Sequence, residues 1–95
     1  MAVQFSANEK LEWYSFRRGR NERVLAVWIP GRAQDGASSE VRTDILLPDV
    51  KVKKAWAIDV LNADVRQLAA KHESGKALLK GMRIHDWPLI VRLEI

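Results

Sequence analysis

Apolar and polar residues alternate with a period of two over several short segments of this chain. Successive side chains of a β-strand point to opposite faces, so the alternation predicts strands with one buried side. It runs through residues 41–47, 56–60 and 89–95. In the second segment we expect Trp56, Ile58 and Val60 to share the buried face.

Other segments indicate strands by composition. Residues 24–29 form a continuous apolar run, which is typical of a strand covered on both faces. Residues 13–16 are rich in strand-forming types and precede a turn at 18–21. In residues 76–82, Leu78, Lys80 and Met82 alternate with Ala77, Leu79 and Gly81.

Turn residues separate these segments at short intervals, and residues 34–39 form a polar loop between two of them. About seven strands at this spacing predict an all-β fold, an antiparallel two-layer β-sandwich. We expect its core to contain Val27, Ile45, Ile58, Leu79 and Val91.

Residues 65–71 are ambiguous. Val65, Leu68 and His72 recur at helical spacing behind Asp64, which could cap a helix. Several of the intervening residues are good helix formers, but propensity is a weak guide to a segment packed on a sheet. Local patterns therefore leave both a short helix and a strand open at 65–71.

Composition narrows the class of protein. The chain has 95 residues, 47% of them hydrophobic, which suits one domain over residues 1–95. It contains no cysteine, so disulfides, thiolate nucleophiles and cysteine-ligated metals are excluded. No apolar run approaches the 20 or so residues of a membrane span, and the first residues lack a signal-peptide layout. These features predict no membrane partner but do not fix the compartment.

Basic residues are concentrated near the first turn. The net charge is +4, and Arg17, Arg18, Arg20 and Arg23 form the densest basic group. Such a group could hold phosphates, but the same pattern is common at a solvated hairpin tip. Because no aromatic interleaving or nucleic-acid-binding motif accompanies it, we do not favour nucleic acid as a partner.

The search for catalytic chemistry is negative. His72 and His85 are the two histidines, and they have no spacing that suits a metal site. His85 and Asp86 are adjacent, so in a strand their side chains point to opposite faces and do not form an acid–base pair. We expect neither enzymatic activity nor a metal or cofactor.

The aromatic residues are the best candidates for binding. Trp28 and Trp56 lie inside apolar strands and are expected in the core. Trp13, Tyr14 and Trp87 lie nearer strand ends, where an exposed ring can stack on a sugar or contact a partner. The alternative is that these rings only cover the ends of the core.

The order of these features resembles the small C-terminal β-sandwich of many (β/α)8-barrel glycoside hydrolases and related proteins. The likeness extends over residues 11–95 and depends on the segments 14–19, 24–28, 41–48, 57–62 and 86–91. Members of that family usually carry glycine where Asn62 stands, and asparagine tolerates the same left-handed turn. The resemblance implies a strand at 65–71, and we follow it.

The resemblance implies a function without catalysis. In those enzymes the catalytic carboxylates lie on the barrel, so no catalytic residue is carried over to this chain. We expect an accessory domain of a larger carbohydrate-active protein that packs on or stabilises a catalytic barrel, with carbohydrate as a further partner. The alternative is a stand-alone binding module for carbohydrate, nucleic acid or another protein.

Overall fold

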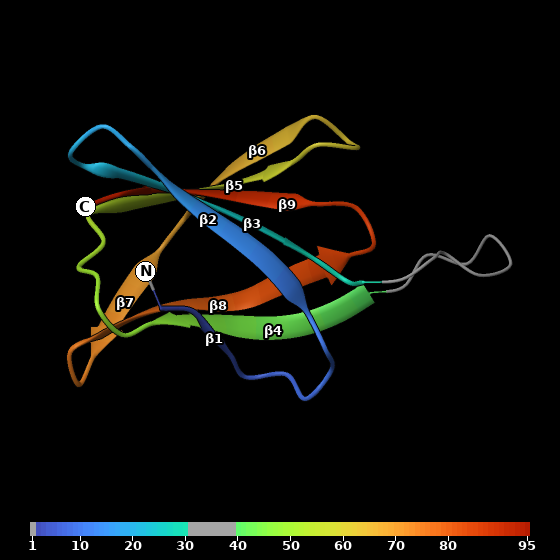
Figure 1. Ribbon diagram of the computed structural model, residues 1–95, viewed down its shortest axis with the longest axis horizontal. Helices are drawn as coiled ribbons and strands as arrows, with labels where there is room; N and C mark the ends of the chain where they lie inside the picture. The colour runs from blue at the N-terminus through green and yellow to red at the C-terminus, as the bar shows by residue number, and fades with distance from the viewer. Residues whose placement is uncertain (1, 31–39) are drawn as a thin grey trace, which may run out of the picture.

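In the computed structural model, which describes residues 2–30 and 40–95, two antiparallel sheets pack face to face (Figure 1). The four-stranded sheet has the order β1 (Gln4–Phe5), β4 (Glu40–Leu47), β8 (Lys76–His85), β7 (Ala70–Glu73). The five-stranded sheet has the order β2 (Glu12–Arg18), β3 (Glu22–Trp28), β9 (Leu89–Glu94), β5 (Lys54–Asp59), β6 (Asp64–Leu68). The predicted antiparallel sandwich is confirmed. The structure has more strands than expected, because the very short β1 was not predicted and because residues 64–73 contribute two strands.

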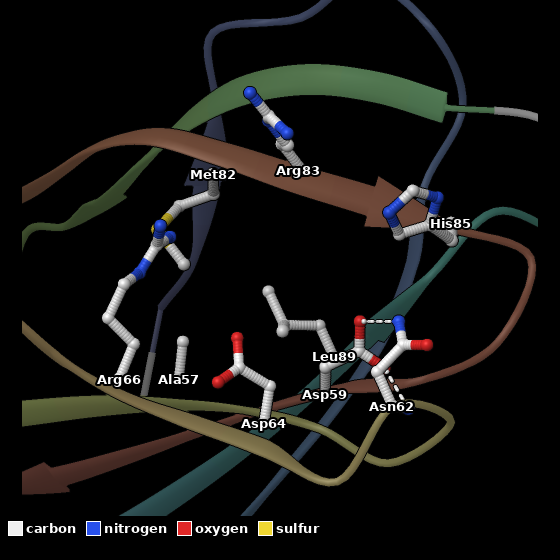
Figure 2. Close-up of a pocket in the computed structure, with 9 residues that line it drawn as sticks. All are labelled: Ala57, Asp59, Asn62, Asp64, Arg66, Met82, Arg83, His85 and Leu89. Atoms are coloured by element: carbon white, nitrogen blue, oxygen red, sulfur yellow. Dashed lines mark hydrogen bonds between the residues drawn. The ribbon is translucent and has the colours of Figure 1, made fainter.

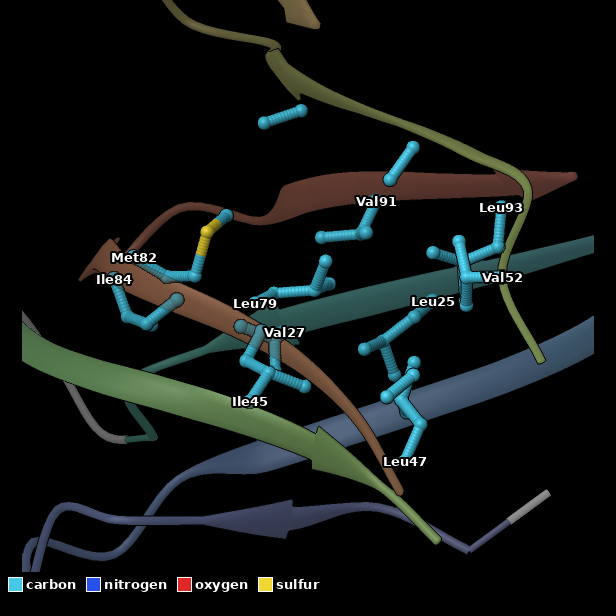
Figure 3. Packing of buried hydrophobic residues seen from close by; sticks show 13 residues of the cluster. Leu25, Val27, Ile45, Leu47, Val52, Leu79, Met82, Ile84, Val91 and Leu93 are labelled. Carbon is cyan, nitrogen blue, oxygen red and sulfur yellow. The ribbon is translucent and has the colours of Figure 1, made fainter. Parts of the chain in front are cut away.

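The hydrophobic core lies between the two sheets (Figure 3). Of the five core residues that the alternation predicts, Val27, Ile45, Leu79 and Val91 have no exposed surface. These residues come from β3, β4, β8 and β9, so both sheets contribute to the same cluster.

The fifth predicted core residue, Ile58, lies on the opposite face of its strand. Ala55 and Ala57 point inward, since they lie opposite Leu93 and Val91 of β9. Ile58 is therefore only half-buried on the outer side, and Val60 is 52% exposed. The prediction was wrong because both faces of this strand are apolar, and alternation alone does not tell which face is inside.

The two tryptophans that were expected in the core also lie outside it. Trp28 follows the inward-facing Val27, and Trp56 lies between the inward-facing alanines of β5. Both rings are half-buried on the outer side of the five-stranded sheet. The inner face of β5 instead carries the small side chains of Ala55 and Ala57, which belong to the core cluster.

A β-bulge in β8 changes which residues face the core. Thr43 lies opposite Met82 and Ile45 lies opposite Leu79, so β8 has one extra residue between these pairs. Gly81 has φ of 67°, and its N–H donates to Asp44 Oδ1 at 3.0 Å. Met82 therefore joins Leu79 on the inner face, and its predicted grouping with Leu78 and Lys80 is wrong.

Residues 65–71 are extended, which confirms the strand and excludes the helix. Val65 lies opposite Ile58 in the five-stranded sheet, whereas Lys71 lies opposite Leu78 in the four-stranded sheet. The segment thus leaves one sheet and enters the other at Ala69. A helix of under ten residues is marginal by itself, so pairing with β5 and β8 outweighs the local helix propensity.

The polar loop expected over residues 34–39 lies outside the described residues. Among residues 2–30 and 40–95, no helix has the length and apolar character needed to cross a membrane.

Candidate functional site

The outer side of the five-stranded sheet carries an unbroken apolar row. Residues directly opposite each other on antiparallel strands share a face. Tyr14 lies opposite Ala26, Ala26 opposite Ile90, Ile90 opposite Ile58, and Ile58 opposite Val65. The row therefore crosses the sheet from β2 to β6 without a charged side chain, and its one polar atom is the hydroxyl of Tyr14.

A second row runs beside the first. It consists of Phe16, Val24, Arg92, Trp56 and Gln67. Its one charged side chain, Arg92, places its guanidinium 5.0 Å from the centre of the Trp56 ring and its Nε 3.1 Å from Glu22 Oε1. Arg92 thus covers an aromatic ring as well as carrying a charge. We call these two rows together the outer apolar face.

The outer side of the four-stranded sheet is different. Its cross-strand positions include Arg42 opposite Arg83 and Glu73 opposite Lys76. Lys71 also lies on this side, opposite the half-buried Leu78. This is the alternation of a sheet with one solvated face. The outer apolar face is therefore specific to the five-stranded sheet.

Several side chains of the outer apolar face are well exposed. Tyr14 is 63% exposed, Val65 61% and Phe16 44%. The rings of Tyr14 and Phe16 lie with centroids 6.2 Å apart at an angle of 42°. Apolar side chains that gather on one surface in this way are typical of interaction sites, whereas scattered ones are not.

The three aromatic residues predicted to bind lie in different places. Tyr14 belongs to the outer apolar face. Trp13 lies opposite Val27, on the inner side of β2, and is partly exposed at the sheet edge. Trp87 is half-buried in the β8–β9 turn, where its ring stacks on His85 at a centroid distance of 4.2 Å. The structure does not bring these three rings into one platform.

Sequence reasoning missed most of the outer apolar face. Trp56 and Ile58 were expected inside the core, and residues 89–95 were interpreted as a strand with one buried side. A signal was present: residues 55–58 and 89–91 are apolar in both phases of the alternation. Apolar residues in both phases are typical of strands covered on both sides, and the four-stranded sheet covers the inner side of these strands.

A polar cavity of about 240 Å³ opens between the two sheets near the β5–β6 turn (Figure 2). Asp59, Asp64, Arg66 and His85 are among its lining residues. Asp59 is fully engaged: its Oδ1 accepts from the N–H groups of Leu61 (3.0 Å) and Asn62 (3.1 Å) and from Trp87 Nε1 (3.0 Å).

The second oxygen of Asp59 is also hydrogen-bonded, because Oδ2 accepts from Asn62 Nδ2 at 2.9 Å. The side-chain bond from Asn62 lowers the pKa of Asp59, and the backbone N–H donors and Trp87 act in the same direction. A carboxylate with a lowered pKa is a poor proton acceptor or donor near neutral pH. The role of Asp59 is therefore structural: its hydrogen bonds hold the β5–β6 turn and the Trp87 ring in place.

The turn itself differs from the expectation drawn from the family. Asn62 was expected to take a left-handed conformation, but Ala63 does so, with φ of 52°. Asn62 instead uses its side chain and backbone to bind Asp59.

His85 and Asp86 form no hydrogen bond with each other, as expected, although Asp86 lies in the bend after β8 and not in the strand. Within the described part of the chain, His85 Nδ1 and Asp86 Oδ1 are buried and neither has a hydrogen-bond partner. No group of three or more histidine, aspartate or glutamate side chains among residues 2–30 and 40–95 is placed to hold a metal ion.

Comparison of the chain with protein-family models, curated proteins and solved structures produced no match.

Proposed function

We propose that this chain is a non-catalytic accessory β-sandwich that docks on a larger protein through the outer apolar face. The partner is the catalytic barrel of a carbohydrate-active protein, as the resemblance in the sequence implies. One observation carries the proposal: an apolar row crosses all five strands of one sheet on its outward side, whereas the outward side of the other sheet carries charged residues and a single apolar pair, Leu46 opposite Leu78.

The energetics favour a covered face. A large aromatic side chain has about 150–250 Å² of surface, so Tyr14 at 63% exposed leaves on the order of 100 Å² in water. At about 25 cal/mol per Å² of apolar surface, burying this one ring on a partner contributes roughly 2.5 kcal/mol. Phe16 and Val65 add to the same surface.

The border of the face suits a protein partner. Glu22 and Lys54 lie beside the second row, both opposite Glu94 of β9, and Glu22 is ion-paired with Arg92 of that row. An apolar centre with a polar rim is the usual composition of a protein–protein interface.

Two matched variants test the docking. Val65 lies on the outer apolar face and Leu61 lies in the turn beyond β5, and the two side chains are almost equally exposed, at 61% and 64%. We expect Val65→Lys to weaken binding to a separately expressed barrel, encoded in the same reading frame, by about tenfold or more, because it places an ammonium group in an apolar contact. Leu61→Lys should leave the affinity within about twofold.

The affinities can be measured by calorimetry, with circular dichroism to verify that both variants fold. Equal effects of the two substitutions would place the contact elsewhere. No binding of the barrel by the unmodified domain would refute the proposal.

A carbohydrate-binding role is the second candidate, because Tyr14 and Phe16 present two exposed rings side by side. Sugar rings stack on exposed aromatic faces, so saturable NMR shifts of both rings on titration with soluble oligosaccharides would favour this role. The 42° angle between the rings is less suited to a flat sugar chain than coplanar rings would be.

A further inference from the structure

Strand β2 forms an edge of the five-stranded sheet (Figure 1). Within the described part of the chain it pairs with β3 alone, in an uninterrupted register from Glu12 to Arg18. It has seven residues, whereas the other edge strands, β1, β6 and β7, have two, five and four. A long edge strand without proline or bulge offers a row of unpaired backbone groups to another strand.

The sequence of β2 is complementary to itself in the antiparallel direction. It reads Glu-Trp-Tyr-Ser-Phe-Arg-Arg from 12 to 18. Pairing with a second copy about Ser15 would place Glu12 opposite Arg18, Trp13 opposite Arg17, and Tyr14 opposite Phe16. These are an opposite-charge pair, a cation beside an aromatic ring, and an aromatic pair, all of which stabilise neighbouring strands.

Neighbouring registers lack this match. A shift by two residues in one direction sets Lys10 opposite Arg18, which are like charges, and leaves Glu12 opposite Phe16. A shift in the other direction sets Tyr14 opposite Arg18, again a cation beside a ring, but it places Glu12 and Trp13 opposite Arg20 and Gly19, which lie in the turn beyond the end of β2. The pairing centred on Ser15 gives every position from 12 to 18 a favourable or neutral partner that lies within the strand.

We propose that two copies of this chain associate through antiparallel pairing of β2 with β2, about a two-fold axis at Ser15. The two five-stranded sheets then form one continuous sheet, and the outer apolar faces of both copies join into a single surface. Each pair of different residues occurs twice, as in any isologous interface, and the two Ser15 residues face each other on the axis. This association uses the backbone edge of β2 and does not depend on docking to a barrel.

A single introduced cysteine tests the axis directly, because the chain has none of its own. Residues directly opposite in an antiparallel pair have Cα atoms roughly 4.5–5.5 Å apart, which is within the range for a disulfide. We expect Ser15→Cys to form a covalent dimer on mild oxidation, seen on a non-reducing gel. Gln67→Cys, on the exposed opposite edge of the same sheet, is the control and should remain monomeric. Equal crosslinking of the two variants would overturn the proposal.

Charge exchange tests the register. Glu12→Arg and Arg18→Glu each turn two attractive pairs into two like-charge pairs, so each should weaken the dimer about tenfold in sedimentation velocity. The double variant restores opposite charges and should recover most of the affinity. The Arg18–Glu22 contact, at 3.8 Å with Arg18 67% exposed, contributes little to folding. Circular dichroism verifies the fold of each variant. A chain that stays monomeric at about 1 mM, or a double variant no better than the single ones, would overturn the proposal.

Discussion

Leu78 and Leu79 are identical neighbours on β8 that differ only in the face they occupy, so they test the assigned core. Leu79 has no exposed surface and lies opposite Ile45 and Ala70. Leu78 is half-buried on the outer side. We expect Leu79→Ala to lower the free energy of unfolding far more than Leu78→Ala does.

The magnitude follows from the atoms removed. Leucine to alanine deletes three carbon atoms, worth about 0.8 kcal/mol each when fully buried, or roughly 2.4 kcal/mol of transfer free energy. The cavity left behind a completely buried Leu79 adds to this, for a total of about 3–4 kcal/mol. For Leu78 the same deletion should cost about 1 kcal/mol, because part of the side chain already contacts water and no closed cavity forms.

Urea unfolding at 25 °C, followed by tryptophan fluorescence, measures both changes. With a slope of about 1.5 kcal/mol per M, Leu79→Ala should shift the midpoint down by about 2 M and Leu78→Ala by less than about 1 M. Such a loss is a large fraction of the 5–15 kcal/mol that stabilises a typical domain. A cost below about 1 kcal/mol for Leu79→Ala, or equal costs for the two variants, would refute the assigned faces.

Two further predictions concern the β5–β6 turn. The folded-state pKa of Asp59 is lowered, so the stability that its carboxylate contributes is present above the ordinary pKa of 3.8 and is lost as pH falls through the folded pKa. In urea unfolding, the wild-type protein should be more stable than Asp59→Asn at pH 7, and this difference should shrink below about pH 4. A difference that stays constant with pH would contradict this prediction. Ala63 has φ of 52°, so Ala63→Gly should relieve left-handed strain and raise the free energy of unfolding by about 0.5–1 kcal/mol, with a lower urea midpoint as the contrary result.

The fold could be predicted because alternation and turn residues report locally on strands. Residues 41–47 and 89–95 show one apolar and one mostly polar phase, and their inward residues Ile45 and Val91 were identified correctly. Where both phases are apolar, as in β5, the pattern contains no information about which phase is inside. The register with β9 decided it, by placing Ala57 opposite Val91.

The bulge in β8 could not be predicted for a similar reason. In the sequence, Gly81 fits the alternation of residues 76–82 and gives no sign of a bulge. Its positive φ and the hydrogen bond to Asp44 depend on β4, which lies far away along the chain. One inserted residue then moves Met82 from the outer to the inner face.

By itself the sequence determined the all-β class, most of the strands and the absence of thiol chemistry, since each depends on residue types and short-range spacing. The self-complementary order of residues 12–18 is likewise a property of the sequence. Tertiary structure alone decided that 12–18 is an edge, that residues 64–73 divide between two sheets, and that apolar residues from five strands meet in one outward face. These outcomes depend on which strands pair and in which register, and that choice is made by contacts between residues distant in the chain, where local periodicity has no influence.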